Sequence, residues 1–403
     1  MKEFQTGFLS LIRAALTDSA PAVSKDFDYG RAYELAESQQ IVPLVYYGAL
    51  KDPLFMSHNM AVRFLERTCA YVGHDADQTE TVNRICAALE AAGIDYMPLK
   101  GVLLKNIYPM PEMRVMGDAD ILIRTADYVK IQKVMFSLFC VPGPESNHEY
   151  NWLTSTGLHI ELHKRLIPSY NEDYYAYYGD GWRLAHPVEG KPHRFDMRPE
   201  DTFIYLFTHF AKHYRDQGVG MKYVVDFYLY RRHNPDLDMA YIARELDNLQ
   251  LYTFYENIMR LLDVWFEGAP SDELMDYLTD KLFTDGVFGR SELNAISEGL
   301  KLSKTAGSAQ KKKKWQLLFP TYKQMCARYP ILVNWAILLP LFWIIRGFDL
   351  LFNHRERYVQ QKKRLDLMTD ENISQYQREL NYVGLDYNFG EEAPPDPPKK
   401  NDR

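Results

Sequence analysis

Apolar residues recur at intervals of three or four through most of the first 93 residues, as they do on one face of an amphipathic helix. This period predicts helices over residues 4–16, 29–50 and 55–92. Pro43 interrupts the second of them and is expected to begin a new helix, because proline fits the first helical turn. Gly93 ends the third as a C-terminal cap. We therefore predict a helical region over residues 1–93.

Beyond residue 93 the period changes, and short apolar runs alternate with helix-like stretches. We predict strands over residues 94–99, 118–123, 148–154 and 157–163, and helices over 102–108 and 126–139. Residues 155–157 (Ser-Thr-Gly) separate the last two strands as a hairpin turn. Residues 170–195, rich in Tyr, Gly and Asp, are expected to form a loop that covers the site. A small mixed sheet between helical regions places the chain in the α+β class.

Helical spacing returns after Pro199. It predicts helices over residues 201–214, 222–232 and 239–267, and a charged helix over 353–385. Residues 303–310 are expected to be a linker. The prolines of the last residues predict a disordered tail. The expected organisation is an N-terminal helical region over 1–93, an α/β core over 94–195, a helical domain over 196–300, a basic and apolar helical region over 301–385 and a tail over 386–403.

Two carboxylates, Asp118 and Asp120, stand at the start of the strand predicted over 118–123. Residues two apart on a strand point to the same side, so both side chains project together. Like charges at close range are unfavourable unless a cation lies between them. Mg²⁺ takes oxygen ligands and commonly joins one or two carboxylates to substrate phosphates. The pair therefore predicts a site for Mg²⁺ (or Mn²⁺), whereas the alternative is a turn with two solvated aspartates.

The turn upstream of this pair has the composition of an anion pocket. A predicted strand breaks at Lys100-Gly101 and continues into a predicted helix, so that backbone N–H groups would face a ligand. Gly101 would let a phosphate approach the backbone closely. Lys100 and Arg114 would add positive charge, and we expect these three residues to bind a nucleotide.

The order of these residues resembles the polymerase-β-like nucleotidyltransferases and, more narrowly, a group of bacterial nucleotidyltransferase family proteins. The residues that carry the resemblance are Leu99-Lys100-Gly101, Tyr108-Pro109, Arg114 and Asp118-Ala119-Asp120. It extends over residues 30–230 and assigns the third carboxylate of the superfamily to Glu161. Val102 stands where the superfamily has a serine, and the spacing from the glycine to the first aspartate is longer than usual. The narrower group also has Lys-Gly at this turn.

The resemblance implies transfer of a nucleoside monophosphate from a nucleoside triphosphate such as ATP to an acceptor hydroxyl, with release of pyrophosphate. Asp118, Asp120 and Glu161 would be the catalytic and metal-binding residues. Two metal ions would stabilise the attacking and leaving oxygens. The altered turn motivates an alternative function: a catalytically inactive nucleotide-binding or membrane-associated adapter that keeps the fold.

Several histidines lie near these positions in the sequence. His159, Glu161 and His163 share one strand face, as three ligands of a transition metal could, but they span about 13 Å of strand, which is too long for one ion. We expect His163 to support the site through hydrogen bonds. The resembling group also has a His-rich helix followed by a helix with an aspartate, here His209, His213 and Asp226. The resemblance assigns these residues to the surroundings of the nucleotide or acceptor.

Composition fits a globular protein, with 46% hydrophobic and 25% charged residues. The four cysteines are scattered without metal-ligand spacing, which is typical of free thiols in a reducing cytoplasm. The net charge of −7 is unevenly spread, because residues 301–364 hold 14 Lys and Arg against two acidic residues. Such asymmetry suggests an anionic partner. A nucleic acid is not expected, because the core is acidic and no basic motif with interleaved aromatics occurs.

The apolar run over residues 330–345 follows this basic stretch. It has 16 residues and is interrupted by Pro340, whereas a membrane span needs about 20 residues. Three interpretations remain open: a buried helix pair, an interfacial segment flanked by Lys, Arg, Trp335 and Trp343, and a true span. We expect a cytoplasmic protein that contacts the inner face of the membrane peripherally through residues 311–345.

Overall fold

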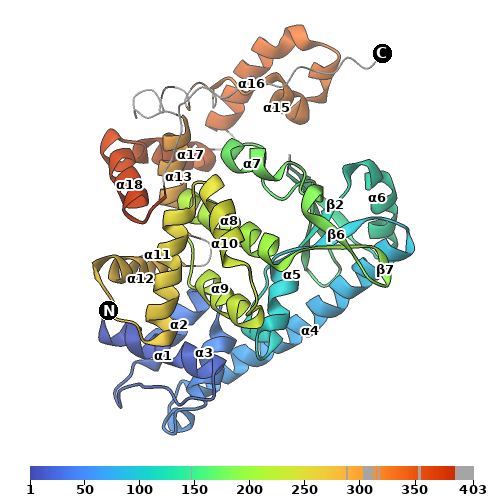
Figure 1. Cartoon of the computed structure of the whole chain (residues 1–403). Helices are drawn as coiled ribbons and strands as arrows, with labels where there is room; N and C mark the ends of the chain where they lie inside the picture. Colours follow the sequence, from blue (N-terminus) through green and yellow to red (C-terminus); the bar gives the residue numbers. More distant parts are fainter. Residues whose placement is uncertain are drawn as a thin grey trace. The chain divides into compact units, whose positions relative to one another are not determined.

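The computed structural model describes residues 1–146, 148–286, 289–302, 311, 313, 315, 318–352 and 355–385 (Figure 1). The chain forms two compact units. The first consists of Met1–Lys212 and Val219–Phe288, and the second of His213–Gly218 and Gly289–Arg403.

The first unit begins with the helices that the apolar spacing predicts. They are α1 (Glu3–Leu16), α2 (Tyr29–Ser38), α3 (Val42–Ala49) and α4 (Ala61–Ala91). Pro43 lies in the first turn of α3, as expected. Gly93 has a φ of +66°, a conformation that glycine adopts without the penalty of a Cβ atom. Ahead of α4 a separate 3-10 turn spans Phe55–Ser57, so the long helix is shorter than predicted.

A mixed sheet of seven strands forms the centre of the described part of the first unit, with the order β3-β4-β5-β2-β1-β7-β6. The strands are β1 (Tyr96–Pro98), β2 (Asp118–Ile123), β3 (Val141–Glu145), β4 (Glu149–Leu153), β5 (His159–His163), β6 (Ala185–Val188) and β7 (Lys191–Met197). Strand β2 pairs antiparallel with β1 and parallel with β5. The α+β class is confirmed, and the predicted strand over 118–123 has the bounds of β2.

Alternation along β2 and β5 gives the sheet one apolar and one polar face. Ala119, Ile121 and Ile123 of β2 lie in a fully buried cluster with Ile160 and Leu162 of β5. The same cluster includes residues of α4 and of α6 (Tyr128–Ser137), which cover this face. The intervening residues of both strands must therefore point to the opposite face. That opposite face carries the carboxylates.

The prediction of a loop over residues 170–195 is wrong. This stretch contains α7 (Glu172–Tyr178) and the antiparallel pair β6–β7. Strand β6 lies at one end of the sheet and β3 at the other. The sequence did not predict β3, and all its residues are exposed. Both terminal strands, β3 and β6, contain proline, which edge strands tolerate because half of their N–H groups face solvent. Polar, proline-containing edge strands lack the apolar alternation on which strand prediction depends.

Five helices follow in the described residues. They are α8 (Pro199–Gln217), α9 (Lys222–His233), α10 (Met239–Asn248), α11 (Tyr252–Leu262) and α12 (Glu273–Asp285). The helix predicted over 239–267 is broken at Gln250, whose φ is +56°, and a π-helical turn over Asp263–Glu267 extends α11. Tyr205 of α8 and Tyr223 of α9 are buried where the charges of Lys100 and its neighbouring carboxylates act on them.

The second unit is helical in its described residues. It contains α13 (Ser291–Leu302), α15 (Tyr322–Arg328), 3-10 turns over Pro330–Val333 and Ala336–Leu338, α16 (Leu339–Phe352), α17 (Arg355–Leu367) and α18 (Asp370–Tyr382). The linker predicted over 303–310 and the tail predicted over 386–403 lie outside the described residues.

The apolar run over 330–345 is divided among two 3-10 turns and the start of α16. Most of its large apolar side chains are exposed, so the interpretation as a buried helix pair is wrong. Within the described ranges, no helix combines the length and apolar character that crossing a membrane requires.

Candidate active site

The polar face of β2 and β5 brings the predicted carboxylates together. In the parallel register Asp118 lies opposite His159, Asp120 opposite Glu161, and Leu122 opposite His163. Neighbouring strands lie about 4.8 Å apart, so side chains on one face at paired positions can share a ligand. The pairing thus joins residues 41 positions apart along the chain through sheet geometry alone.

Asp120 is the buried centre of the site. Its side chain is 4% exposed, and Oδ1 accepts hydrogen bonds from Lys100 Nζ at 2.6 Å and from His163 Nε2 at 2.7 Å. Burial acts to raise the pKa of Asp120, but the two nearby positive groups outweigh it and hold the pKa well below its ordinary value. Asp120 is therefore an anion at neutral pH.

Asp118 is electrostatically different from its neighbour. Burial and then the negative charge of Asp120 raise the pKa of Asp118 to about 6, although Lys100 opposes the shift. The side chain remains partly accessible. A carboxylate that is costly to ionise gains from any added cation, so Asp118 favours a positively charged ligand.

His163 connects the carboxylates to a second histidine. Its Nε2 lies 3.4 Å from Glu161 Oε2, and its Nδ1 lies 3.1 Å from His148 Nε2. Burial acts to lower the pKa of His163, but hydrogen bonds with Asp120 and Glu161 outweigh it and raise the pKa. Burial, followed by the charge of His163, lowers the pKa of His148, so His148 is the neutral partner.

The described residues contain two groups of three possible metal ligands, and within each group the ligand atoms lie within 4.8 Å of one another. One is Asp120, Glu161 and His163, and the other is His148, Glu149 and His163. Two carboxylate oxygens and an imidazole nitrogen at this spacing fit a divalent cation, and first-row metals such as Mn²⁺ accept nitrogen more readily than Mg²⁺ does. His159 is exposed and belongs to neither group, so three ligands from one strand is not the arrangement found.

The Lys-Gly turn differs in detail from the expected anion pocket. The predicted helix is only four residues long (α5, Gly101–Leu104) and continues as a 3-10 turn. A Cβ atom on Gly101 would lie 3.0 Å from Met116 Cγ, so the glycine permits close packing within the protein. Lys100 has a φ of +45° and a ψ of −117°, which strains a residue that has a side chain. The ammonium of this strained residue donates to Asp120.

Arg114 is bound inside the protein. Its Nε and Nη2 donate to Asp226 Oδ1 and Oδ2 at 3.0 and 2.9 Å, and Tyr108 Oη donates to Oδ1 at 2.7 Å. The charge predicted to neutralise a phosphate is therefore balanced by Asp226. Lys222 Nζ donates to the backbone oxygen of Val115 at 3.2 Å, and burial, followed by the charge of Arg114, lowers the pKa of Lys222 to about 7.

Helix α8 carries the two histidines that the resemblance assigned to the surroundings of the nucleotide or acceptor. His209 is buried in the first unit, with its ring centroid 6.2 Å from that of Tyr205. His213 belongs to the second unit, where its Nδ1 lies 3.4 Å from Gln217 Nε2. Neither residue belongs to the two described groups that could bind a metal.

Sequence reasoning missed two residues. Tyr205 is fully buried, the charges of Lys100, Asp120 and Glu161 act on it, and its hydroxyl has no hydrogen-bond partner in the described structure. Nothing in the sequence separates it from other core tyrosines. His148 could have been found, because the hairpin turn over 155–157 fixes the register that brings the start of β4 beside the end of β5.

Comparisons with known proteins point to a family. Residues 25–267 match the family described as "Uncharacterised nucleotidyltransferase". Comparison with curated proteins and with solved structures gives no match. The matched range contains all the residues of the site described above and more than half of the chain. The chain therefore belongs to this uncharacterised nucleotidyltransferase family.

Proposed function

We propose that the protein is a metal-dependent nucleotidyltransferase of the polymerase-β-like type. It would transfer a nucleoside monophosphate from a nucleoside triphosphate to an acceptor hydroxyl. The hydroxyl oxygen bonds to the α-phosphorus, the bond from that phosphorus to the bridging oxygen breaks, and pyrophosphate leaves. The observation that carries the proposal is the meeting of Asp118, Asp120 and Glu161 on one face of paired strands β2 and β5.

The donor set supports a divalent cation. Asp120, Glu161 and His163 would hold the ion, with Asp118 beside them on β2. When bound, the ion would supply positive charge to the oxygens of the reacting phosphate. The chain could also bind the ion through His163, a ligand that the sequence did not predict.

The remaining residues would bind and orient the substrate. Lys100 is bonded to Asp120 and would therefore lie beside any phosphate that the ion holds, where its ammonium would balance phosphate charge. Glu161 is partly exposed and, as the alternative to holding the ion, would accept the proton from the acceptor hydroxyl. The Tyr205 hydroxyl would donate a hydrogen bond to the substrate. Arg114 and Asp226 would fix the wall of the site instead of touching the nucleotide.

The experiment is label transfer by the pure chain with Mg²⁺ or Mn²⁺ and each triphosphate labelled at the α-phosphate, with and without cell extract. Transfer should be lost in Asp118→Asn and Asp120→Asn, which keep the side-chain shape. His159→Gln is the matched control, because His159 is exposed on β5 and lies outside the metal groups. Full transfer by Asp118→Asn would show that the assignment is wrong.

A specific observation favours the inactive adapter as a second candidate. Asp120 is already paired with Lys100 and hydrogen-bonded to His163, so its charge is balanced by the protein itself. Binding of a triphosphate without release of pyrophosphate under any metal condition would support this candidate. Release of pyrophosphate that depends on Asp120 would exclude it.

A further inference from the structure

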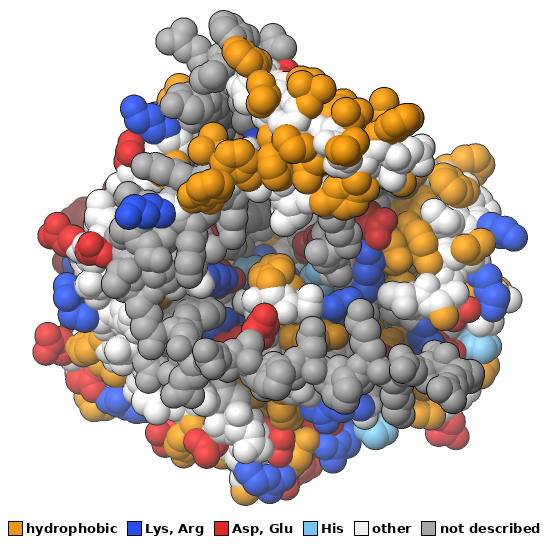
Figure 2. Space-filling view, turned by 90° about the horizontal axis from the view of Figure 1, so that it is seen from above, with side chains coloured by type: hydrophobic (Ala, Val, Ile, Leu, Met, Phe, Trp, Pro, Cys, Tyr) orange, Lys and Arg blue, Asp and Glu red, His pale blue; other side chains and the backbone are white. Residues whose placement is uncertain are grey.

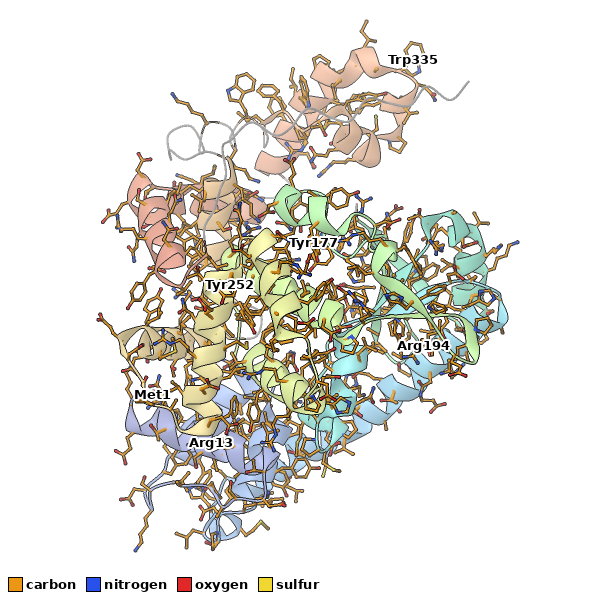
Figure 3. All side chains as sticks on the ribbon, in the orientation of Figure 1. Met1, Arg13, Tyr177, Arg194, Tyr252 and Trp335 are labelled. Atoms are coloured by element: carbon orange, nitrogen blue, oxygen red, sulfur yellow. The ribbon has the colours of Figure 1, made fainter. Side chains whose placement is uncertain are left out.

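Exposed apolar side chains gather in the second unit, between Trp315 and Phe348. The most exposed of them are Ile337, Val333, Trp315, Leu318, Trp335, Ile344 and Phe348. Ile337 is 84% exposed and Trp335 is 59% exposed, and the sticks of Figure 3 show Trp335 pointing away from its ribbon. Figure 2 shows hydrophobic side chains covering one continuous area of the surface. We call the exposed apolar side chains of residues 315–348 the apolar face.

The apolar face rests on a packed scaffold. Trp343 Nε1 donates to the backbone oxygen of Pro320 at 3.0 Å, and Tyr322 Oη donates to that of Leu332 at 2.8 Å. The Trp343 ring meets Phe319 edge-on with centroids 5.1 Å apart. These contacts tie α15, the 3-10 turns and α16 together. The apolar side chains are therefore exposed from an ordered structure, and such patches mark sites of association.

The charged residues within the stretch 315–348 are all basic. Residues 315–348 contain no Asp or Glu, while they contain Lys323, Arg328 and Arg346. Arg328 Nη2 pairs with Asp349 at 2.6 Å, just beyond this stretch. Lys311 and Lys362 are exposed on either side of it in the sequence. An apolar surface with tryptophan and a basic border has the composition of a segment that lies in the headgroup region of a bilayer.

We propose that the apolar face binds the surface of an anionic phospholipid bilayer. The exposed side chains of Trp335 and Ile337 would enter the boundary between headgroups and acyl chains, and the basic residues would attract the lipid phosphates. A second copy of the chain is the less favourable occupant, because pairing of two such faces would bring their basic borders together. This inference is independent of the proposed transferase activity.

The test is sedimentation of the pure full chain with vesicles of phosphatidylglycerol and phosphatidylcholine in equal parts. The double variant Trp335→Glu/Ile337→Glu should bind at least tenfold more weakly, because charged side chains oppose entry into the bilayer. Val129→Glu is the matched control, since Val129 is 67% exposed on α6 and should leave binding unchanged. The single variant Ile337→Ser provides a milder change should the double variant fold poorly.

Two further measurements separate the contributions. Vesicles of phosphatidylcholine alone should bind the wild-type chain weakly, and added salt should weaken binding to the anionic vesicles. Equal binding of the double variant and the wild type would overturn the proposal. So would sedimentation equilibrium showing that the wild-type chain dimerises through Trp335 and Ile337 while binding neither kind of vesicle.

Discussion

Arg114 and Asp226, which are 112 residues apart, form a buried ion pair with two parallel hydrogen bonds. The pair joins the segment before β2 to helix α9. Both side chains are less than a tenth exposed, so each charge depends on the other for compensation. Removing one partner of a buried ion pair leaves the other charge buried and without compensation.

Asp226→Asn should therefore destabilise the chain by about 3–5 kcal/mol, the usual result of breaking a buried ion pair. The measurement is urea unfolding in the absence of ligand. Glu37→Gln is the matched control, because the ion pair of Glu37 with Arg67 is partly exposed and its loss should cost less than about 1 kcal/mol. Equal losses in the two variants would contradict the role of burial.

Asp118→Asn should stabilise the free chain at neutral pH. Burial and Asp120 raise the folded-state pKa of Asp118 from 3.8 to about 6, so the folded chain holds a proton that the unfolded chain has released. Wild-type stability therefore falls as pH rises from about 4 to about 6, by about 3 kcal/mol at most. The amide variant lacks this loss, and unfolding in chelator at about pH 4 and about pH 7 measures it.

Asp95→Asn serves as the control of opposite sign. Burial acts to raise the pKa of Asp95, but hydrogen bonds with His193 and Arg124 outweigh it and lower the pKa. The wild-type carboxylate thus contributes stability that is present above its unfolded pKa and is lost as pH falls. The amide variant should be the less stable chain at neutral pH. An advantage of Asp118→Asn that does not vary with pH would contradict the raised pKa.

His163→Gln should weaken binding of Mn²⁺ more than binding of Mg²⁺, because Mn²⁺ binds imidazole nitrogen more strongly than Mg²⁺ does. The expected loss for Mn²⁺ is roughly tenfold or more. Isothermal titration calorimetry in the absence of nucleotide measures the affinities without reference to activity. His159→Gln, on the same strand but outside both groups of ligand atoms, should change neither affinity. Unaltered Mn²⁺ binding by His163→Gln would exclude the histidine as a ligand.

Lys100→Gly should be more stable than Lys100→Ala by about 1–3 kcal/mol. Both variants lose the ammonium, but only glycine adopts a φ of +45° without strain. Thermal unfolding of the two variants isolates the backbone contribution. At Lys105, whose φ of −56° is helical, the order should reverse, because glycine there costs about 0.5–1 kcal/mol relative to alanine. The same order at both positions would argue against strain at Lys100.

Tyr205→Phe should leave the stability of the free chain unchanged or higher, since the hydroxyl it removes is buried without a partner. Nucleotide affinity should fall if this hydroxyl binds the substrate. Tyr178→Phe is the matched control, because the buried Tyr178 hydroxyl is bonded to Thr208 at 2.8 Å and its loss should cost about 1 kcal/mol. Unfolding and nucleotide titration together test both parts, and unchanged affinity in Tyr205→Phe would remove it from the site.

The sequence predicted the elements that have a clear pattern of apolar residues. Strand β2 was found with its bounds because Ile121, Leu122 and Ile123 form a compact apolar run after a glycine. Strands β3 and β6 were missed because they lie at the two ends of the sheet order and contain proline, so neither alternation nor propensity marks them. The pairing of Asp120 with Glu161 followed from a resemblance, since periodicity does not reveal which strands are neighbours.

The partners of individual charges were harder to predict than the elements. Arg114 was expected to face a phosphate, yet it pairs with Asp226, which lies on a helix distant in sequence. His148 and His163 are close because the turn at residues 155–157 pairs β4 antiparallel with β5. The possible metal site of His159, Glu161 and His163 considered only one strand and not the strands beside it. Contacts of this kind depend on tertiary packing, which one-dimensional patterns do not encode.

Parallel pairing of β2 with β5 means that the chain must cross over before these strands can meet. Strands β3 and β4 and helix α6 all lie between them in the chain, so Asp118 and Asp120 are synthesised before Glu161 and His163. A cation that takes ligands from both strands can therefore bind only after β5 has paired with β2. Such a ligand stabilises only the completed sheet. The stabilisation should therefore appear as slower unfolding with an unchanged folding rate.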